Sequence, residues 1–259
     1  MEFLANPDTW IALLTLIFLE IVLGIDNIIF ISIAVSKLPQ KLQKKATNVG
    51  MLLAMVLRIL LLFGISVLVA MEKPFFHIDL PWIKVGITGQ SLIMLAGGIF
   101  LLTKSVQEIH HKMEGHEISE EENNPKKNTS LSNAIIQITL INIVFSFDSI
   151  LTAVGMTTGI EGALWVMIIA VIISIIIMML FAVPVGNFVT RHPTVQMLGL
   201  SFLILIGFIL ISEGAHMAHL EIFQQKVGVI PKGYLYFTIA FSLGVEAINM
   251  KMRKKTVYK

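Results

Sequence analysis

Two apolar segments of the chain carry polar, oxygen-bearing side chains at matching positions, 122 residues apart. The residues are Glu20, Asp26, Asn27, Asn142, Asp148 and Ser149. Oxygen ligands suit hard divalent ions such as manganese, magnesium and calcium better than copper(I) or zinc. Ionisable groups inside a membrane are costly and usually serve a function. The pattern therefore predicts a path for a cation through a membrane.

A basic residue, Arg58, lies near the middle of another apolar segment. Three carboxylates and one guanidinium would leave a formal charge of −2, which matches one divalent cation, provided that all four groups meet and ionise. The alternative is a buried ion pair between Arg58 and Glu20 that only fixes helix packing. Both interpretations are open at this point.

Helix geometry constrains how the acidic side chains can meet. Glu20 and Asn27 are seven residues apart and share a face, whereas Asp26 lies about 120° away from Glu20 on a regular helix. Convergence would need local unwinding, for which Gly24 is the candidate. The alternative is a path with separate stations on either side of Glu20.

Further polar groups lie near the ends of later apolar segments. Glu246 and Asn249 share a helix face near the chain's C-terminal end. Glu213, His216 and His219 follow one another at about one helical turn. They could form an exit site, although solvation at the membrane interface explains them equally well.

Two other groups could bind metal. His110, His111 and His116 form a histidine-rich tract, but no ligand spacing is enforced there, so a solvated linker is the preferred interpretation. Met178 and Met179 could offer a soft ligand, yet nothing in the sequence places them near the acidic residues.

The elements that must position these residues are membrane helices. The chain is 56% hydrophobic and only 14% charged, against about 25% charged in soluble domains. A spanning helix needs about 20 mostly apolar residues. Seven segments qualify: 10–35, 49–71, 85–105, 131–156, 162–186, 195–212 and 233–250. We therefore predict an all-α polytopic membrane protein with about seven transmembrane helices.

The basic residues predict its orientation. Four lysines lie in residues 37–45, five basic residues lie in the tail 251–259, and Arg191 follows the fifth segment. If seven helices alternate, all three groups fall on one side, which is the cytoplasmic side. The N-terminus is then outside and the C-terminus cytoplasmic. The first helix lacks the basic flank of a cleaved signal peptide and is expected to be retained.

The matched acidic positions also predict an internal repeat. Residues 1–105 would form a first three-helix repeat, 106–130 a polar cytoplasmic linker, 131–215 a second repeat, and 216–259 an external loop, the seventh helix and the tail. Three helices is an odd number, so the two repeats would be inverted, as in many transporters. The segments 98–103 and 207–212 also resemble each other. Chance similarity between apolar helices is the alternative.

Several functional classes lack sequence support. The chain has no cysteine, which excludes disulfides and thiolate ligands. It has no GxxxxGK[ST] loop for ATP, no HExxH and no GxSxG. We expect no enzymatic activity and no resident cofactor. Secondary transport is the default, with carboxylates that exchange a metal ion for protons.

The chain resembles the TerC family of bacterial integral membrane proteins. The resemblance lies in LGIDN at 23–27, FSFDS at 145–149, LRI at 57–59, RHPT at 191–194, IPKGY at 230–234 and FSLGVEA at 241–247. It covers nearly the whole chain apart from the linker. The family was named for tellurium resistance and is associated with export of metal ions, chiefly manganese. It belongs to a superfamily that includes the lysine exporter.

By this resemblance, Asp26 and Asp148, with Glu20, Asn27 and Ser149 beside them, would be the ion-handling residues of a multi-pass protein in the bacterial inner membrane. The leading hypothesis is a secondary exporter of divalent metal, with manganese as its cargo. The rivals are an exporter of an oxyanion such as tellurite or of another small solute, and a non-transporting scaffold that partners a secretion or stress-response complex. The expected partners are the lipid bilayer and the metal ion, with a homo-oligomer left open and no nucleic acid.

Overall fold

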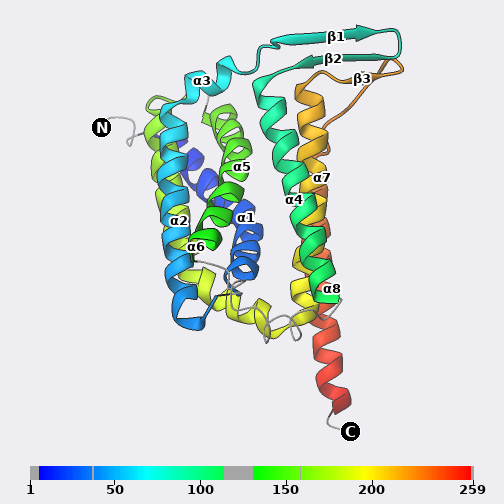
Figure 1. The fold of residues 1–259 in the computed structure, drawn as a ribbon. Coiled ribbons are helices and arrows are strands. Elements are labelled where there is room, and N and C mark those ends of the chain that lie inside the picture. Colours follow the sequence, from blue (N-terminus) through cyan, green and yellow to red (C-terminus); the bar gives the residue numbers. More distant parts are fainter. Residues whose placement is uncertain (1–5, 37, 114–130, 158, 258–259) are drawn as a thin grey trace. The chain divides into compact units, whose positions relative to one another are not determined.

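The structure is a computed structural model that describes residues 6–36, 38–113, 131–157 and 159–257 (Figure 1). Its helices are α1 (Pro7–Ser36), α2 (Gln40–Phe63), α3 (Ile65–Ala70), α4 (Gly89–Met113), α5 (Leu131–Thr157), α6 (Ala163–Arg191), α7 (Pro193–Met217) and α8 (Lys232–Val257). Its strands are β1 (Phe76–Leu80), β2 (Ile83–Ile87), β3 (Glu221–Ile222) and β4 (Gln225–Lys226).

Six of the described helices are long and apolar enough to cross a membrane: α1, α2, α4, α5, α6 and α7. They confirm the predicted all-α polytopic membrane fold. The predicted seventh span, 233–250, is also helical and lies within α8, but α8 is not among the six. Glu246, Asn249 and two tyrosines make this segment more polar than the others.

Helix ends differ from the predicted boundaries because those boundaries followed apolar content alone. α2 begins at Gln40 rather than near residue 49, since its lysine- and glutamine-rich start has good helix propensity. It ends at Phe63, and Gly64 separates it from the short α3. α4 begins only at Gly89, because residues 83–87 form β2.

The predicted linker is partly helical. α4 continues to Met113, so His110 and His111 lie in its last turn rather than in a loop. Positive charge there would be favourable, since the C-terminal end of a helix is the negative end of its dipole. The rest of the predicted linker, with His116, lies outside the described residues.

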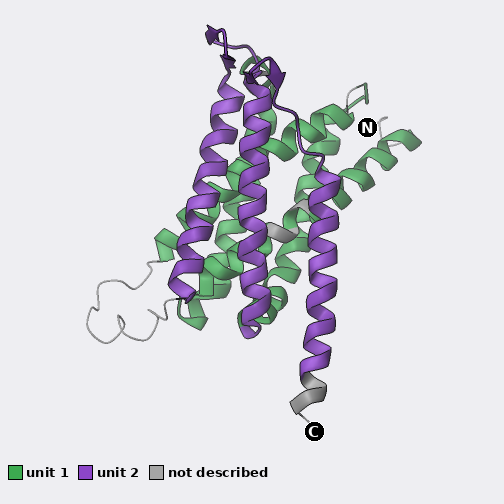
Figure 2. Cartoon of the chain, turned by 90° about the vertical axis from the view of Figure 1, so that its right-hand side faces the viewer, with its two compact units in different colours: residues 1–71, 121–190 green, residues 72–120, 191–259 purple. Residues whose placement is uncertain are grey.

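The chain forms two compact units, each of which combines segments from both predicted halves (Figure 2). Unit 1 comprises residues 1–71 and 121–190, and unit 2 comprises residues 72–120 and 191–259. In unit 1, α5 packs against both α1 and α2. Figure 1 shows α1 and α5 running in opposite directions. An inverted repeat requires this, but the repeat itself and its boundaries stay predictions.

Unit 2 is built on the close packing of α4 against α7. A Cβ atom added at Gly98 would lie 2.6 Å from the carbonyl oxygen of Gly207. One added at Gly207 would lie 3.0 Å from the carbonyl oxygen of Gly98. Small residues at such crossings let membrane helices approach closely. The two glycines begin the segments 98–103 and 207–212, whose sequences resemble each other, so these similar segments contact one another.

A four-stranded antiparallel sheet in unit 2 was not predicted from the sequence. Its order is β1-β2-β3-β4, with Ile83 opposite Ile222 in the pairing of β2 with β3. One hairpin comes from the segment before α4 and the other from the segment after α7. Because β2 pairs with β3, the segment before α4 and the segment after α7 lie on the same side. This agrees with four membrane crossings between them, one each by α4, α5, α6 and α7.

Candidate functional site

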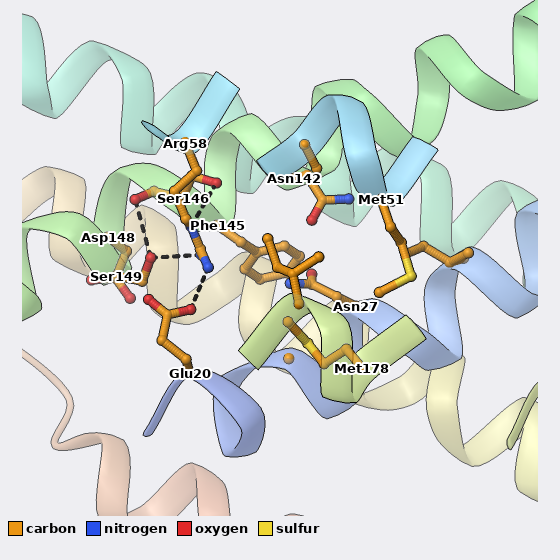
Figure 3. Close-up of a pocket in the computed structure, with 14 residues that line it drawn as sticks. Glu20, Asn27, Met51, Arg58, Asn142, Phe145, Ser146, Asp148, Ser149 and Met178 are labelled. Atoms are coloured by element: carbon orange, nitrogen blue, oxygen red, sulfur yellow. Dashed lines mark hydrogen bonds and ion pairs between the residues drawn. The ribbon is translucent and has the colours of Figure 1, made fainter. Parts of the chain in front are cut away.

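One pocket in unit 1 is lined by side chains of α1, α2, α5 and α6 (Figure 3). Five of the six predicted oxygen-bearing residues line it, together with the predicted arginine: Glu20, Asn27, Asn142, Asp148, Ser149 and Arg58. Its cavity has a volume of about 30 Å³, which is room for a small ion or about two water molecules. Positions 122 residues apart in the sequence therefore meet in one pocket.

Arg58 lies at the centre of the charged part of this pocket. Its guanidinium forms an ion pair with Glu20 of α1, and both side chains are only 7% exposed. Its Nη2 donates to Ser149 Oγ at 2.7 Å, and its Nε donates to Ser146 Oγ at 3.2 Å. Arg58 of α2 thereby links α1 to α5. The contact between Arg58 and Glu20 is the one that the helix-packing alternative required.

Asn27 presents a buried oxygen atom to the same pocket. Its side chain is 7% exposed, and its Oδ1 has no hydrogen-bond partner among the described residues. Leaving a buried polar atom unpaired costs about 1–3 kcal/mol, so such an atom needs a water molecule or a cation as its partner. Asn142 of α5 donates its Nδ2 to the carbonyl oxygen of Ile138 at 2.9 Å. Its own side-chain oxygen can then accept or coordinate a ligand.

Asp148 gives the described pocket its net charge. It lines the pocket from α5 and is 9% exposed. Because Arg58 balances Glu20, these three side chains together carry a formal charge of −1, rather than the −2 predicted with Asp26 included. Asp26 lies in α1, but its side chain is outside the described part of the structure.

The expected unwinding at Gly24 does not occur, because α1 is a continuous helix from Pro7 to Ser36. Gly24 has a different role. A Cβ atom there would lie 2.0 Å from the sulfur of Met178, so glycine lets α6 place this thioether directly against α1. Glu20 and Asp148 share the pocket without a broken helix, because α5 runs antiparallel beside α1.

Glu20 also lines a second, smaller pocket, whose other lining residues are apolar. The lining of that pocket includes Leu16 of α1, Leu62 of α2 and Ala153 of α5. The first pocket instead reaches Ile31 of α1 and Met51 of α2, which lie toward the other ends of these two helices. The two pockets therefore follow one another along the helices, with Glu20 between them. This agrees with a path that has stations on either side of Glu20.

Among the described residues, no three histidine, aspartate or glutamate side chains gather as a metal-binding group. The residues that line the first pocket offer carboxylate, amide, hydroxyl and thioether groups to a cation.

A family model described as "Integral membrane protein TerC family" matches residues 5–258. The chain belongs to the TerC family. It is 43% identical over 253 residues to a "UPF0053 protein" of Haemophilus influenzae, with 98% of both chains covered. It is 44% identical over 252 residues to the "UPF0053 inner membrane protein YgdQ" of Escherichia coli, with 97% of both covered. Against the "UPF0053 protein YegH" of Escherichia coli it is 42% identical and covers 43% of that protein. No solved structure matches the chain.

Two predicted supporting residues of this TerC protein do not line the pocket. Glu213 lies in α7 and Glu246 in α8, both in unit 2. Glu246 accepts a hydrogen bond from the hydroxyl of Thr194, which joins α8 to α7. His216 is exposed, and its Nδ1 lies 3.0 Å from the carbonyl oxygen of Val227. An exit site at these residues stays a prediction.

Among the pocket residues with polar, aromatic or sulfur-bearing side chains, the sequence interpretation missed Met51, Phe145 and Ser146. It named Met178 as a possible soft ligand but could not place it near the acidic residues. Ser146 could have been found, because it lies one helical turn from both Asn142 and Ser149 and so shares their face. The two methionines carried no such signal, since the chain has fourteen methionines. Only the packing of α2 and α6 against α1 selects these two.

Proposed function

We propose that this TerC-family protein is a secondary transporter that exports divalent metal cations, with manganese as its main cargo, across the bacterial cytoplasmic membrane. The unpartnered oxygen of Asn27, in a pocket that also holds the Asp148 carboxylate, carries this proposal. Oxygen donors with a net negative charge suit a hard divalent cation. Asp148 can exchange that cation for a proton, which gives the coupling.

The rival functions fit this pocket less well. An oxyanion such as tellurite would require net positive charge, whereas the described pocket carries −1. A scaffold explains the pair of Glu20 and Arg58 as helix packing but leaves the Asn27 oxygen unexplained. The proposed transporter is not an enzyme, holds no resident cofactor and requires no partner besides the bilayer and its cargo. A second copy or a secretion complex would belong to the scaffold alternative.

The proposed function is tested by metal content in cells that lack their own manganese exporters. We expect cells that express the chain to hold severalfold less manganese under manganese load than cells with an empty vector. Tellurite tolerance should be the same in both. Equal manganese content, with the chain verified to be present in the membrane, would count against metal export. A gain in tellurite tolerance alone would favour export of an oxyanion.

We also propose that the N-terminus is outside and the C-terminus cytoplasmic, on the distribution of lysine and arginine. The absence of cysteine makes single introduced cysteines unique labels. In spheroplasts, a membrane-impermeant maleimide should label Lys84→Cys in β2 without permeabilisation, and Lys251→Cys in α8 only after it. The opposite labelling pattern would show that the protein has the opposite orientation in the membrane. Labelling of both without permeabilisation would mean that α8 does not cross the membrane.

A further inference from the structure

The thioether of Met178 lies on the face of α1 that carries two of the proposed cation-handling residues. Met178 is 5% exposed, lines the pocket, and places its sulfur against Gly24. Gly24 is four residues after Glu20 and three before Asn27, so these three residues share one helix face. The sulfur atom is therefore held between the turn of Glu20 and the turn of Asn27.

The pocket has two levels with different chemistry. Seven residues, or about 10 Å of helix, separate Glu20 from Asn27 on α1 and Arg58 from Met51 on α2. In Figure 3 the ion pair lies at one end of the pocket, and the amides of Asn27 and Asn142 lie at the other with Met51 and Met178, with Phe145 between the two ends. The second level is neutral and offers amide oxygens together with sulfur.

We propose that Met178 is a ligand for the transported cation and makes this site prefer transition-metal ions, and soft divalent ions such as cadmium, over magnesium and calcium. The inference rests on the proposed metal transport and adds its selectivity. Oxygen ligands alone serve magnesium and calcium well, whereas a thioether is a soft ligand that these hard ions do not favour. The unpartnered Asn27 oxygen is the oxygen donor on the same level.

The substitution Met178→Leu tests the proposal, because it removes the sulfur at nearly constant volume, which buried sites usually tolerate. Met179→Leu is the matched control, since Met179 is the next residue of α6 and does not line the pocket. We would reconstitute the wild type and both variants in liposomes. Manganese and cadmium uptake would then be measured against competing magnesium.

We expect Met178→Leu to lose selectivity for cadmium over magnesium by roughly tenfold, which corresponds to about 1.4 kcal/mol. The loss for manganese, which is harder than cadmium, should be smaller. Met179→Leu should behave like the wild type. Unchanged selectivity in Met178→Leu, with transport intact, overturns the assignment while leaving metal transport standing. If the wild type transports none of these cations, the proposed function fails and the selectivity proposal fails with it.

X-ray absorption on cadmium-loaded protein gives an independent readout. Because the chain contains no cysteine, any sulfur atom in the cadmium coordination shell must come from a methionine. A sulfur shell should be present in the wild type and in Met179→Leu, and absent in Met178→Leu. A sulfur shell that survives in Met178→Leu would come from another methionine, such as Met51, and would contradict the assignment to Met178.

Discussion

Asp148→Asn should abolish metal export while the protein still reaches the membrane. Asp148 is buried in the pocket, and the other described carboxylate there, Glu20, is already paired with Arg58. Replacing the carboxylate by an amide of similar size removes the net negative charge that attracts a cation. A cation bound next to Asp148 would form a buried charge pair with it. Losing one member of such a pair costs about 2–5 kcal/mol, so we expect the affinity for the cation to fall by roughly 30-fold or more.

The measurement is manganese content in exporter-deficient cells, at matched membrane abundance. Asp79→Asn is the control, because Asp79 is an exposed aspartate of β1 whose partner is the surface residue Lys84. It should export like the wild type. Asp26→Asn should resemble Asp148→Asn if the paired acidic positions in the sequence act together. Wild-type export by Asp148→Asn would contradict a cation path through this pocket and favour the scaffold alternative.

Arg58→Ala should destabilise unit 1 more than any other single change in the pocket. It removes the guanidinium that joins α2 to Glu20, Ser146 and Ser149. Breaking a buried ion pair by deleting one partner typically costs about 3–5 kcal/mol, because the remaining charge stays buried and uncompensated. For a chain of this size, that corresponds to a fall of roughly 10 °C in the melting temperature of the purified protein in detergent.

A second substitution separates the cost of an unpaired charge from the loss of packing. Adding Glu20→Gln to Arg58→Ala removes the uncompensated carboxylate, so the double variant should recover part of the lost stability. Ser149→Ala serves as the milder comparison, since it removes only one hydroxyl partner of Arg58. If the double variant melts lower than Arg58→Ala, the buried charge is not the source of the instability. If Arg58→Ala melts and transports like the wild type, the ion pair contributes to neither property.

The two described carboxylates of the pocket, Glu20 and Asp148, are expected to have different roles. Glu20 is tied to Arg58 and holds helices together, whereas Asp148 is the described acid that leaves the pocket net negative. We therefore expect the helix-packing interpretation to hold for Glu20 and the cation-handling interpretation for Asp148. The expected variants follow this division, with a stability defect for Arg58 and a transport defect for Asp148.

The amino-acid sequence alone determined the membrane class and most of the polar residues that line the pocket. Long apolar segments with few charges can satisfy their backbone hydrogen bonds in lipid only as helices, so composition and length suffice to predict the spans. Polar residues inside such segments stand out because each is costly there. For this reason Glu20, Asn27, Arg58 and Asp148 could be identified without coordinates.

Elements of mixed composition were predicted less well. The basic start of α2 and the end of α4 at Met113 are helical although they are not apolar. The sheet of β1 to β4 depends on pairing between hairpins far apart in the sequence, with Ile83 opposite Ile222. Such pairing leaves no periodic signal in either segment by itself.

Only the tertiary structure decided which groups meet. Helical spacing placed Glu20 and Asn27 on one face, but it could not show that Arg58 pairs with Glu20 or that the Asn27 oxygen has no partner. Nor could it place Met178, one of fourteen methionines, in the pocket, since a methionine in an apolar helix looks the same whether it faces lipid or a pocket. The reason is physical: polarity is encoded residue by residue, whereas contact depends on the packing of helices that are far apart in the chain.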